Sequence, residues 1–145
     1  MRIALGADHR GFFLKERIKA FLDELGHDPV DFGAEDSEPS DYPDFAIKAA
    51  GAVASGKCER GILICGTGIG MSIAANKVKG VFAARCCSVQ DAEMCRRHNN
   101  ANVMTLSAET PTDDVREMVR VFLETGFEGG RHERRVRKIT GYECN

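Results

Sequence analysis

The chain lacks several features that would assign it to common classes of protein. It has no apolar run of transmembrane length, and its formal net charge over 145 residues is only −2. We therefore expect neither a membrane partner nor a nucleic-acid partner. It has no internal repeat, low-complexity segment or interdomain linker, and strand-like sequence begins at residue 2, so we expect no signal peptide. These absences favour one globular domain spanning residues 1–145.

The cysteines also lack the spacings of common cysteine sites. There is no C-x-x-C pair, so a thiol redox protein would have no resolving cysteine beside Cys65. Cys95 and His98 follow Cys86 and Cys87 with a spacing that suits zinc poorly. We expect no metal, and reduced thiols in a cytoplasmic protein. The six cysteines are Cys58, Cys65, Cys86, Cys87, Cys95 and Cys144.

Strand and helix patterns alternate along the chain. Strands are predicted over 2–7, 29–32, 61–64, 81–86 and 102–106, and helices over 11–25, 44–55, 71–77, 88–97, from about 110, and in the basic tail from Arg131. This order predicts an α/β fold, a three-layer α/β/α Rossmann-like sandwich with a five-stranded parallel sheet. Ligands bind beyond the carboxyl ends of such strands. Residues 8–10 and 65–70 should therefore share one edge.

A glycine-rich turn directly follows the third predicted strand and reads Cys65-Gly66-Thr67-Gly68-Ile69-Gly70. Such a turn presents backbone N–H groups to an anion and places the thiol at the positive end of a helix dipole. The dipole alone gives only a marginal thiolate at neutral pH. A further donor is needed, and Thr67 or a substrate group is available for it. The turn predicts chemistry on a small anionic molecule.

The competing motifs that contain glycine or cysteine do not fit this turn. A dinucleotide fingerprint requires glycine where Met71 stands, and an acid at the end of the next strand, where Arg85 and Cys86 stand. A P-loop requires G-K-[ST], which is absent, and a cysteine phosphatase requires arginine in the place of Met71. The turn therefore suits a small oxyanion or sugar oxygens, and we expect no cofactor.

Two histidines and two arginines are further candidates. His9 directly follows the first predicted strand, a position that favours a functional role. His98 ends a predicted helix in a basic run, which would equally suit the C-terminus of a helix without a functional role. Arg131 and Arg135 are one helical turn apart and form a plausible phosphate fork. The alternative is a solvated basic surface.

Five segments occur in the order typical of one known family: DHRG (8–11), DYP (41–43), CGTGIGMSIAANK (65–77), HNNAN (98–102) and GGRHERR (129–135). Together they resemble the type B ribose-5-phosphate isomerases, a family that includes the galactose-6-phosphate isomerase subunits. The resemblance spans nearly the whole chain. It implies an aldose–ketose isomerase without metal or cofactor, acting on a phosphorylated sugar. It also implies a homodimer, or a tetramer formed as a dimer of dimers, with sites at the subunit interface.

The resemblance implies a role for each matching residue. Cys65 would be the base that moves a proton between C2 and C1 through an enediolate, and Thr67 with the turn N–H groups would stabilise the oxyanion. His98, assisted by Asp8, would open the sugar ring. The residues implied to bind substrate are His9, Arg131 and Arg135 at the phosphate, Tyr42 and Asn99 at the sugar, and Gly66, Gly68, Ile69, Gly70 and Ser72 in and after the turn. His98 and Asn99 would come from the neighbouring subunit.

One position departs from the family pattern. Many members carry arginine shortly after the fifth strand, where this chain has Glu109. Either another cation compensates, the side chain points away, or the preferred sugar differs. Because Cys65 and His98 occur in one chain, we expect a self-sufficient homo-oligomer. It would interconvert ribose 5-phosphate and ribulose 5-phosphate. The alternatives are a six-carbon substrate such as allose or galactose 6-phosphate, and non-catalytic sugar-phosphate binding.

Overall fold

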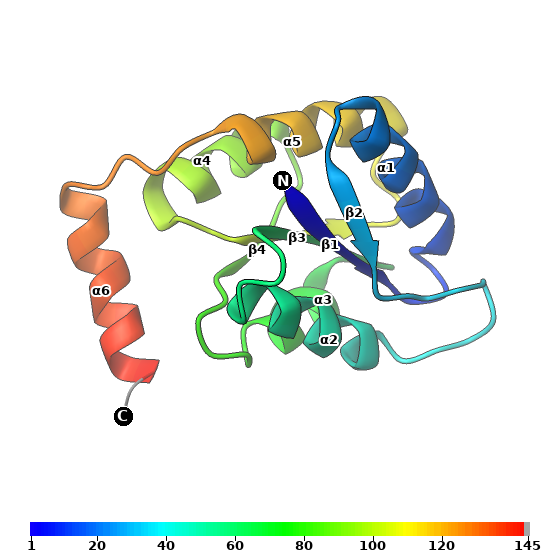
Figure 1. Ribbon diagram of the computed structural model, residues 1–145, viewed down its shortest axis with the longest axis horizontal. Helices are drawn as coiled ribbons and strands as arrows, with labels where there is room; N and C mark the ends of the chain where they lie inside the picture. Colours follow the sequence, from blue (N-terminus) through cyan, green and yellow to red (C-terminus); the bar gives the residue numbers. More distant parts are fainter. Residues whose placement is uncertain (144–145) are drawn as a thin grey trace.

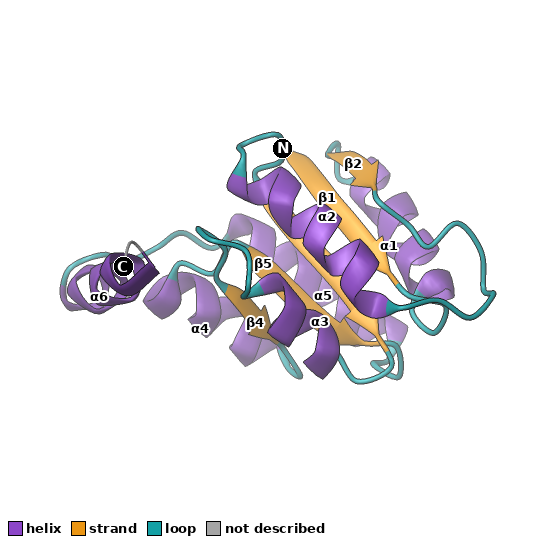
Figure 2. Ribbon diagram, turned by 90° about the horizontal axis from the view of Figure 1, so that it is seen from below, coloured by secondary structure: helices purple, strands orange, loops and turns teal. Residues whose placement is uncertain are grey.

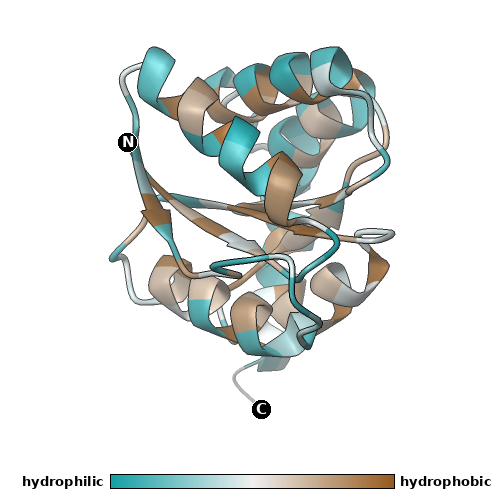
Figure 3. Cartoon of the chain, turned by 90° about the vertical axis from the view of Figure 1, so that its right-hand side faces the viewer, coloured by the Kyte–Doolittle hydropathy of each residue, from teal (hydrophilic) through white to brown (hydrophobic). Residues whose placement is uncertain are grey.

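A five-stranded parallel sheet forms the middle layer of the fold, with helices above and below it (Figures 1 and 3). The computed structural model describes residues 1–143. The strands, in the spatial order β2-β1-β3-β5-β4, are β1 (Arg2–Ala7), β2 (Asp28–Asp31), β3 (Arg60–Cys65), β4 (Ala83–Arg85) and β5 (Val103–Ser107). Every paired strand runs parallel to its neighbour. The predicted fold class is confirmed.

The helices divide between the two faces of the sheet (Figure 2). One face carries α1 (Phe12–Glu24), α4 (Val89–Asn99) and α5 (Thr112–Glu124), and the other carries α2 (Tyr42–Ala54) and α3 (Ile69–Ala75). The last helix, α6 (Arg131–Glu143), lies beside α4 and away from the sheet (Figures 1 and 2). Among residues 1–143, no helix is both long and apolar enough to cross a membrane.

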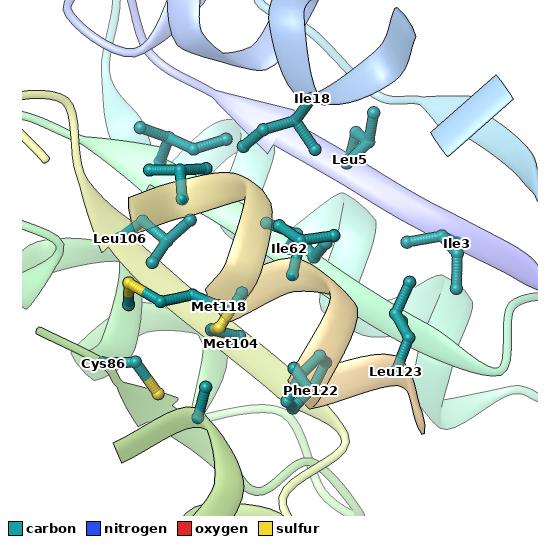
Figure 4. Packing of buried hydrophobic residues seen from close by; sticks show 14 of the residues in the cluster. Ile3, Leu5, Ile18, Ile62, Cys86, Met104, Leu106, Met118, Phe122 and Leu123 are labelled. Carbon is teal, nitrogen blue, oxygen red and sulfur yellow. The ribbon is translucent and has the colours of Figure 1, made fainter. Parts of the chain in front are cut away.

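Successive side chains of each strand pack into two separate hydrophobic cores, one on each face of the sheet. On β1, Ile3 and Leu5 enter the core beneath α1 and α5, whereas Ala4 enters the core beneath α2, because successive strand residues face opposite ways. Figure 4 shows the first core, which includes Leu106 of β5 and Phe122 of α5. Full burial of such a side chain contributes about 1.5–3 kcal/mol.

Most predicted boundaries differ from the observed ones by one or two residues, and three elements illustrate this. Helix α2 begins at Tyr42 instead of residue 44, because Pro43 suits the first turn of a helix and does not end the preceding loop. Strand β4 spans only Ala83–Arg85, because Asn102 binds the Phe82 N–H through its side-chain oxygen at 2.9 Å, ahead of the strand ladder. Helix α3 begins at Ile69, two residues before its predicted start.

The strand order creates a crevice between the ends of β1 and β3. The chain leaves β1 toward one face to form α1, and leaves β3 toward the opposite face to form α3. Two adjacent loops that diverge in this way leave space between them, which is the usual ligand position in such sheets. The fold thus places the segment after β1 beside the glycine-rich turn after β3, as predicted.

A buried lysine ties the edge of the sheet to α1. Lys15 is 1% exposed, and its Nζ lies 2.6 Å from Oδ2 of Asp31, at the end of β2. The second carboxylate oxygen of Asp31 accepts the Gly33 N–H at 2.9 Å. Burial alone would raise the pKa of Asp31, but hydrogen bonds from Lys15, Gly33 and Lys19 outweigh it, and the pKa is lowered. This pair anchors the loop that leads to the crevice.

We expect Asp31→Asn to lower the free energy of unfolding at pH 7 by about 1–3 kcal/mol, because it removes the shorter of the two carboxylate contacts of the buried Lys15 and leaves only Glu16 Oε1, at 2.8 Å. The folded-state pKa of Asp31 is lowered, so its contribution is present above its unfolded value, near 3.9, and is lost as the pH falls through the folded value. Urea unfolding at pH 7 and below pH 4 measures this. A difference between the two proteins that stays constant with pH would contradict it.

Candidate active site

A shallow cleft of about 200 Å³ lies at the carboxyl ends of β1 and β3. It is lined by Asp8, Arg10, Tyr42, Cys65, Gly66, Thr67 and Gly70. Six of these seven residues were predicted to belong to the site, and Arg10 was not. The structure therefore brings together segments that are more than fifty residues apart in the sequence.

Three successive carbonyl groups of the glycine-rich turn accept hydrogen bonds from side chains of β4 and β5. Ser107 Oγ donates to the Gly66 carbonyl at 2.7 Å, and Thr105 Oγ1 donates to the Gly68 carbonyl at 2.9 Å. Arg85 Nε donates to the Thr67 carbonyl at 2.7 Å. A peptide unit is planar, with its C=O and N–H pointing opposite ways. Holding these carbonyls therefore directs the N–H groups of residues 67–69 away from the sheet.

One of these N–H groups meets the cysteine sulfur. Cys65 is 4% exposed, and its Sγ accepts the Gly68 N–H at 3.2 Å. Gly68 has a φ of +76°, and a Cβ there would lie 2.9 Å from the Leu106 carbonyl carbon, so glycine is required on both counts. The further donor sought from the sequence is therefore the Gly68 backbone. Thr67 Oγ1 instead accepts the Ile69 N–H at 3.2 Å.

The segment after β1 forms a tight turn that fixes two candidate side chains. Asp8 is buried, and its Oδ1 accepts the N–H groups of Arg10 at 3.0 Å and Gly11 at 3.2 Å. His9 is held by Ser40, whose N–H donates to His9 Nδ1 at 3.2 Å and whose Oγ accepts the His9 N–H at 3.1 Å. Nδ1 also lies 3.2 Å from the Ser40 carbonyl oxygen, so Ser40 holds this ring nitrogen in either tautomer.

The remaining turn and helix candidates occupy different surroundings. The Tyr42 ring lies against Gly70, where a Cβ would be 2.7 Å from Tyr42 Cζ. Ile69 is 49% exposed at the start of α3. Ser72 Oγ lies 3.5 Å from the Ala83 carbonyl, and Ser72 is not among the residues that line the cleft.

Four predicted residues lie far from the cleft within one chain. His98 and Asn99 end α4, and Arg131 and Arg135 occupy the first turns of α6, with both arginines exposed. Both views place α6 and the end of α4 at the opposite side of the molecule from the loop between β2 and α2 (Figures 1 and 2). A single chain therefore presents the predicted residues as two separate groups.

The group at the end of α4 contains a possible set of metal ligands. One ligand atom each from His98, Glu128 and His132 lies within 4.8 Å of the others. The two imidazole rings are stacked, with centroids 4.2 Å apart and planes 12° from parallel. Lone pairs in nearly parallel ring planes do not converge on one ion, and Glu128 is already paired with Arg97. The arrangement favours ring stacking over coordination.

Stacking is also consistent with the charge on these rings. Burial, and the nearby positive charges of His98 and Arg131, lower the pKa of His132. A neutral His132 can pack against His98 without repelling its charged form.

The cysteines that have no predicted role form two local arrangements. Cys86 and Cys95 are buried with their sulfurs 3.9 Å apart, whereas Cys87 is exposed, with its sulfur 2.7 Å from Arg85 Nη1. The five cysteines of residues 1–143 are free thiols, and Cys144 lies outside the described residues. The suggested cluster of Cys86, Cys87, Cys95 and His98 is not assembled as a metal site, since the ligand set found at His98 contains no cysteine.

The sequence analysis missed Ser40, Thr105 and Ser107, and noted Arg85 only as an obstacle to nucleotide binding. Each acts through a hydrogen bond to a residue distant in sequence, so no local motif marks it. The one available signal was the position of Arg85, Thr105 and Ser107 at or near the carboxyl ends of neighbouring strands.

Comparison with known proteins gives the family. The sequence profile of the ribose/galactose isomerases matches residues 3–139. The chain belongs to this family. Over 143 residues it is 45% identical to ribose-5-phosphate isomerase B of Escherichia coli K12, covering 98% of this chain and 96% of the relative. It is also 41% identical over 145 residues to D-erythrulose-4-phosphate isomerase of Pectobacterium atrosepticum, covering 99% and 95%.

Solved structures agree closely with the fold. Clostridium thermocellum ribose-5-phosphate isomerase B superposes with a TM-score of 0.97 at 48% identity, covering 99% of this chain and 98% of the other. The Mycoplasma genitalium enzyme, solved with bound ribulose-5-phosphate, gives 0.95 at 43% identity, covering 99% and 97%. The protein is thus a sugar-phosphate isomerase. Because its relatives act on different sugars, the family alone does not specify the substrate.

We expect Thr105→Val to lower the free energy of unfolding by about 1–3 kcal/mol and to reduce turnover, because the Gly68 carbonyl loses its buried donor. Thr105→Ser keeps the hydroxyl and serves as the matched control. Chemical unfolding and a steady-state isomerase assay on both variants measure these effects. Equal behaviour of the valine and serine variants would show that the hydroxyl does not hold the turn.

Proposed function

We propose that the protein interconverts ribose 5-phosphate and ribulose 5-phosphate through an enediolate, with Cys65 as the base and without a metal. The observation that carries this proposal is the Gly68 N–H at 3.2 Å from Cys65 Sγ, inside the cleft of about 200 Å³. Hydrogen-bond donation of this kind favours a negatively charged sulfur. The named activities of the E. coli and Mycoplasma relatives support the choice of sugar.

The isomerisation has two requirements that the glycine-rich turn meets. A proton on carbon beside a carbonyl is only weakly acidic, so the base must be held close and the charge that develops on oxygen must be stabilised. In our proposal Cys65 removes the C2 proton of the open-chain aldose and returns it to C1, while the hydroxyl proton on O2 passes to O1, which leaves the carbonyl at C2. The Thr67 hydroxyl, and the turn N–H groups that Cys65 and Thr67 do not already accept, stabilise the enediolate oxygen.

The rest of the site comes, in this proposal, from a second copy of the chain. The cleft is smaller than the roughly 300–1,000 Å³ of common ligand sites and is open to solvent. A neighbouring α4 end and α6 would close it. Ile69, Ile73 and Ile139 are about half exposed, as expected of apolar residues that become covered in a homodimer or a dimer of dimers.

The roles divide between the two copies. His98 of the partner, with Asp8, opens the sugar ring by acid–base catalysis. His9, Arg131 and Arg135 bind the phosphate. Fixing that end of a flexible open-chain sugar lowers the entropic cost of aligning the reacting carbons. Tyr42 and Asn99 contact the sugar, with Ile69, Gly70 and Ser72 at the start of α3. The free thiols fit the reducing cytoplasm in which we place the protein.

A second candidate is the same reaction on another sugar phosphate. Glu109 places a carboxylate at the rim of the cleft, 3.5 Å from Arg10, and so changes the charge that a substrate meets. Six-carbon sugars such as allose or galactose 6-phosphate, and the four-carbon substrate named for the Pectobacterium relative, are the alternatives. Relative kcat/KM values across ribose, allose, galactose and erythrulose phosphates separate them.

We expect Cys65→Ala to lower ketose formation from ribose 5-phosphate by at least about 100-fold, the usual contribution of a general base. Substrate binding should persist. Cys58→Ala, an equally buried cysteine outside the cleft, is the control and should retain turnover. The parent should be equally active with and without a chelator. Turnover by the Cys65 variant would rule out this base, and loss of parent activity with chelator would rule out the metal-free mechanism.

A further inference from the structure

Arg10 occupies the rim of the cleft, at the edge predicted for residues 8–10, but the sequence assigned it no role. Its guanidinium lies over the glycine-rich turn: a Cβ built on Gly66 would be 2.6 Å from Arg10 Nη1, so a larger residue at position 66 would displace the guanidinium. On its other side, Nη2 lies 3.5 Å from Oε1 of Glu109. The two side chains are 56% and 79% exposed, so both reach solvent at the mouth of the cleft.

The backbone around this pair is fixed by the bonds that hold the turn. The Glu109 N–H donates to Ser107 Oγ at 3.1 Å, and the same hydroxyl donates to the Gly66 carbonyl. The Arg10 N–H is bound to Asp8 Oδ1 at 3.0 Å. The pair therefore joins the segments after β1 and β5 directly above the segment after β3. A ligand in the cleft meets the Arg10 guanidinium, and the Glu109 carboxylate lies on the other side of that guanidinium.

We propose that Arg10 is an anion-binding residue of the substrate cleft and that Glu109 sets its affinity by competing with the anion for the guanidinium. This deepens the proposed function and rests on it. An ion pair this long and this exposed is weak, and a phosphate can replace the carboxylate because guanidinium binds phosphate through two parallel hydrogen bonds. Glu109 then stays nearby as a like charge. Competition of Glu109 for the Arg10 guanidinium and repulsion between Glu109 and the anion both weaken anion binding.

The proposal also explains how a carboxylate is tolerated beside a phosphate. Glu109 neither points away from the cleft nor stands without a counter-charge, because Arg10 is its partner. The repulsion by Glu109 grows with the charge of the bound group. The binding of a sugar phosphate that is fully ionised, above its second pKa near 6, is therefore weakened more than the binding of one that carries a single negative charge. Added salt should reduce the difference, because both groups are exposed.

The test is equilibrium binding of inorganic phosphate to the purified full-length protein, followed by calorimetry at low salt and pH 7.5. Glu109→Gln should lower the Kd about twofold to fivefold, the range expected from an exposed pair. Arg10→Gln should raise the Kd at least about fivefold, because the bidentate donor is lost. The matched control is Glu24→Gln, which removes the same charge from another exposed pair, with Arg116 at 3.0 Å on the far helices, and should leave the Kd unchanged.

Two further measurements separate the possible failures. Glu109→Gln should lower KM for ribose 5-phosphate with little change in kcat, and its effect on phosphate binding should shrink in the Arg10→Gln background. An unchanged or higher Kd for Glu109→Gln, or an equal shift for Glu24→Gln, would overturn the inference. Because phosphate binding does not require turnover, an absence of ribose 5-phosphate isomerisation would contradict only the proposed function.

Discussion

The strands of this sheet all run in one direction, and the position of every candidate residue follows from that. The carboxyl ends of the strands lie on one edge of the sheet. Asp8 and Cys65 therefore meet there, although α1, β2, α2 and most of β3 lie between them in the sequence. A helix that follows a strand must run back toward the opposite edge. Helix α4 therefore carries His98 away from Cys65, and α6 begins on that same side. One chain offers two complementary groups that it cannot itself bring together.

The geometry of the cleft depends on the hydrogen bonds that the neighbouring strands make to the carbonyl groups of the glycine-rich turn. Arg85, Thr105 and Ser107 bind three successive carbonyls, and planar peptides convert that restraint into a fixed direction for the N–H groups facing Cys65. Preorganised donors of this kind stabilise developing charge without reorganisation during the reaction. The geometry comes from the neighbouring strands, so the chemistry of the turn depends on the whole sheet.

The sequence predicted the elements better than their mutual contacts. Strand β1 was predicted with its observed bounds, because its pattern depends on residues close in sequence. The turn at Cys65 was recognisable from its glycines for the same reason. The strand order, the support from Thr105 and the pairing of Arg10 with Glu109 join distant segments, and local patterns do not encode them.

The most direct test of a site shared between two copies is subunit complementation. Cys65→Ala and His98→Gln chains, each inactive alone, are coexpressed with different tags, and the mixed oligomer is purified through both tags. If each site takes Cys65 from one copy and His98 from the other, half the sites of a mixed dimer are intact, and about half of the parent activity per dimer returns. Mixed oligomers as inactive as either variant alone would contradict the account.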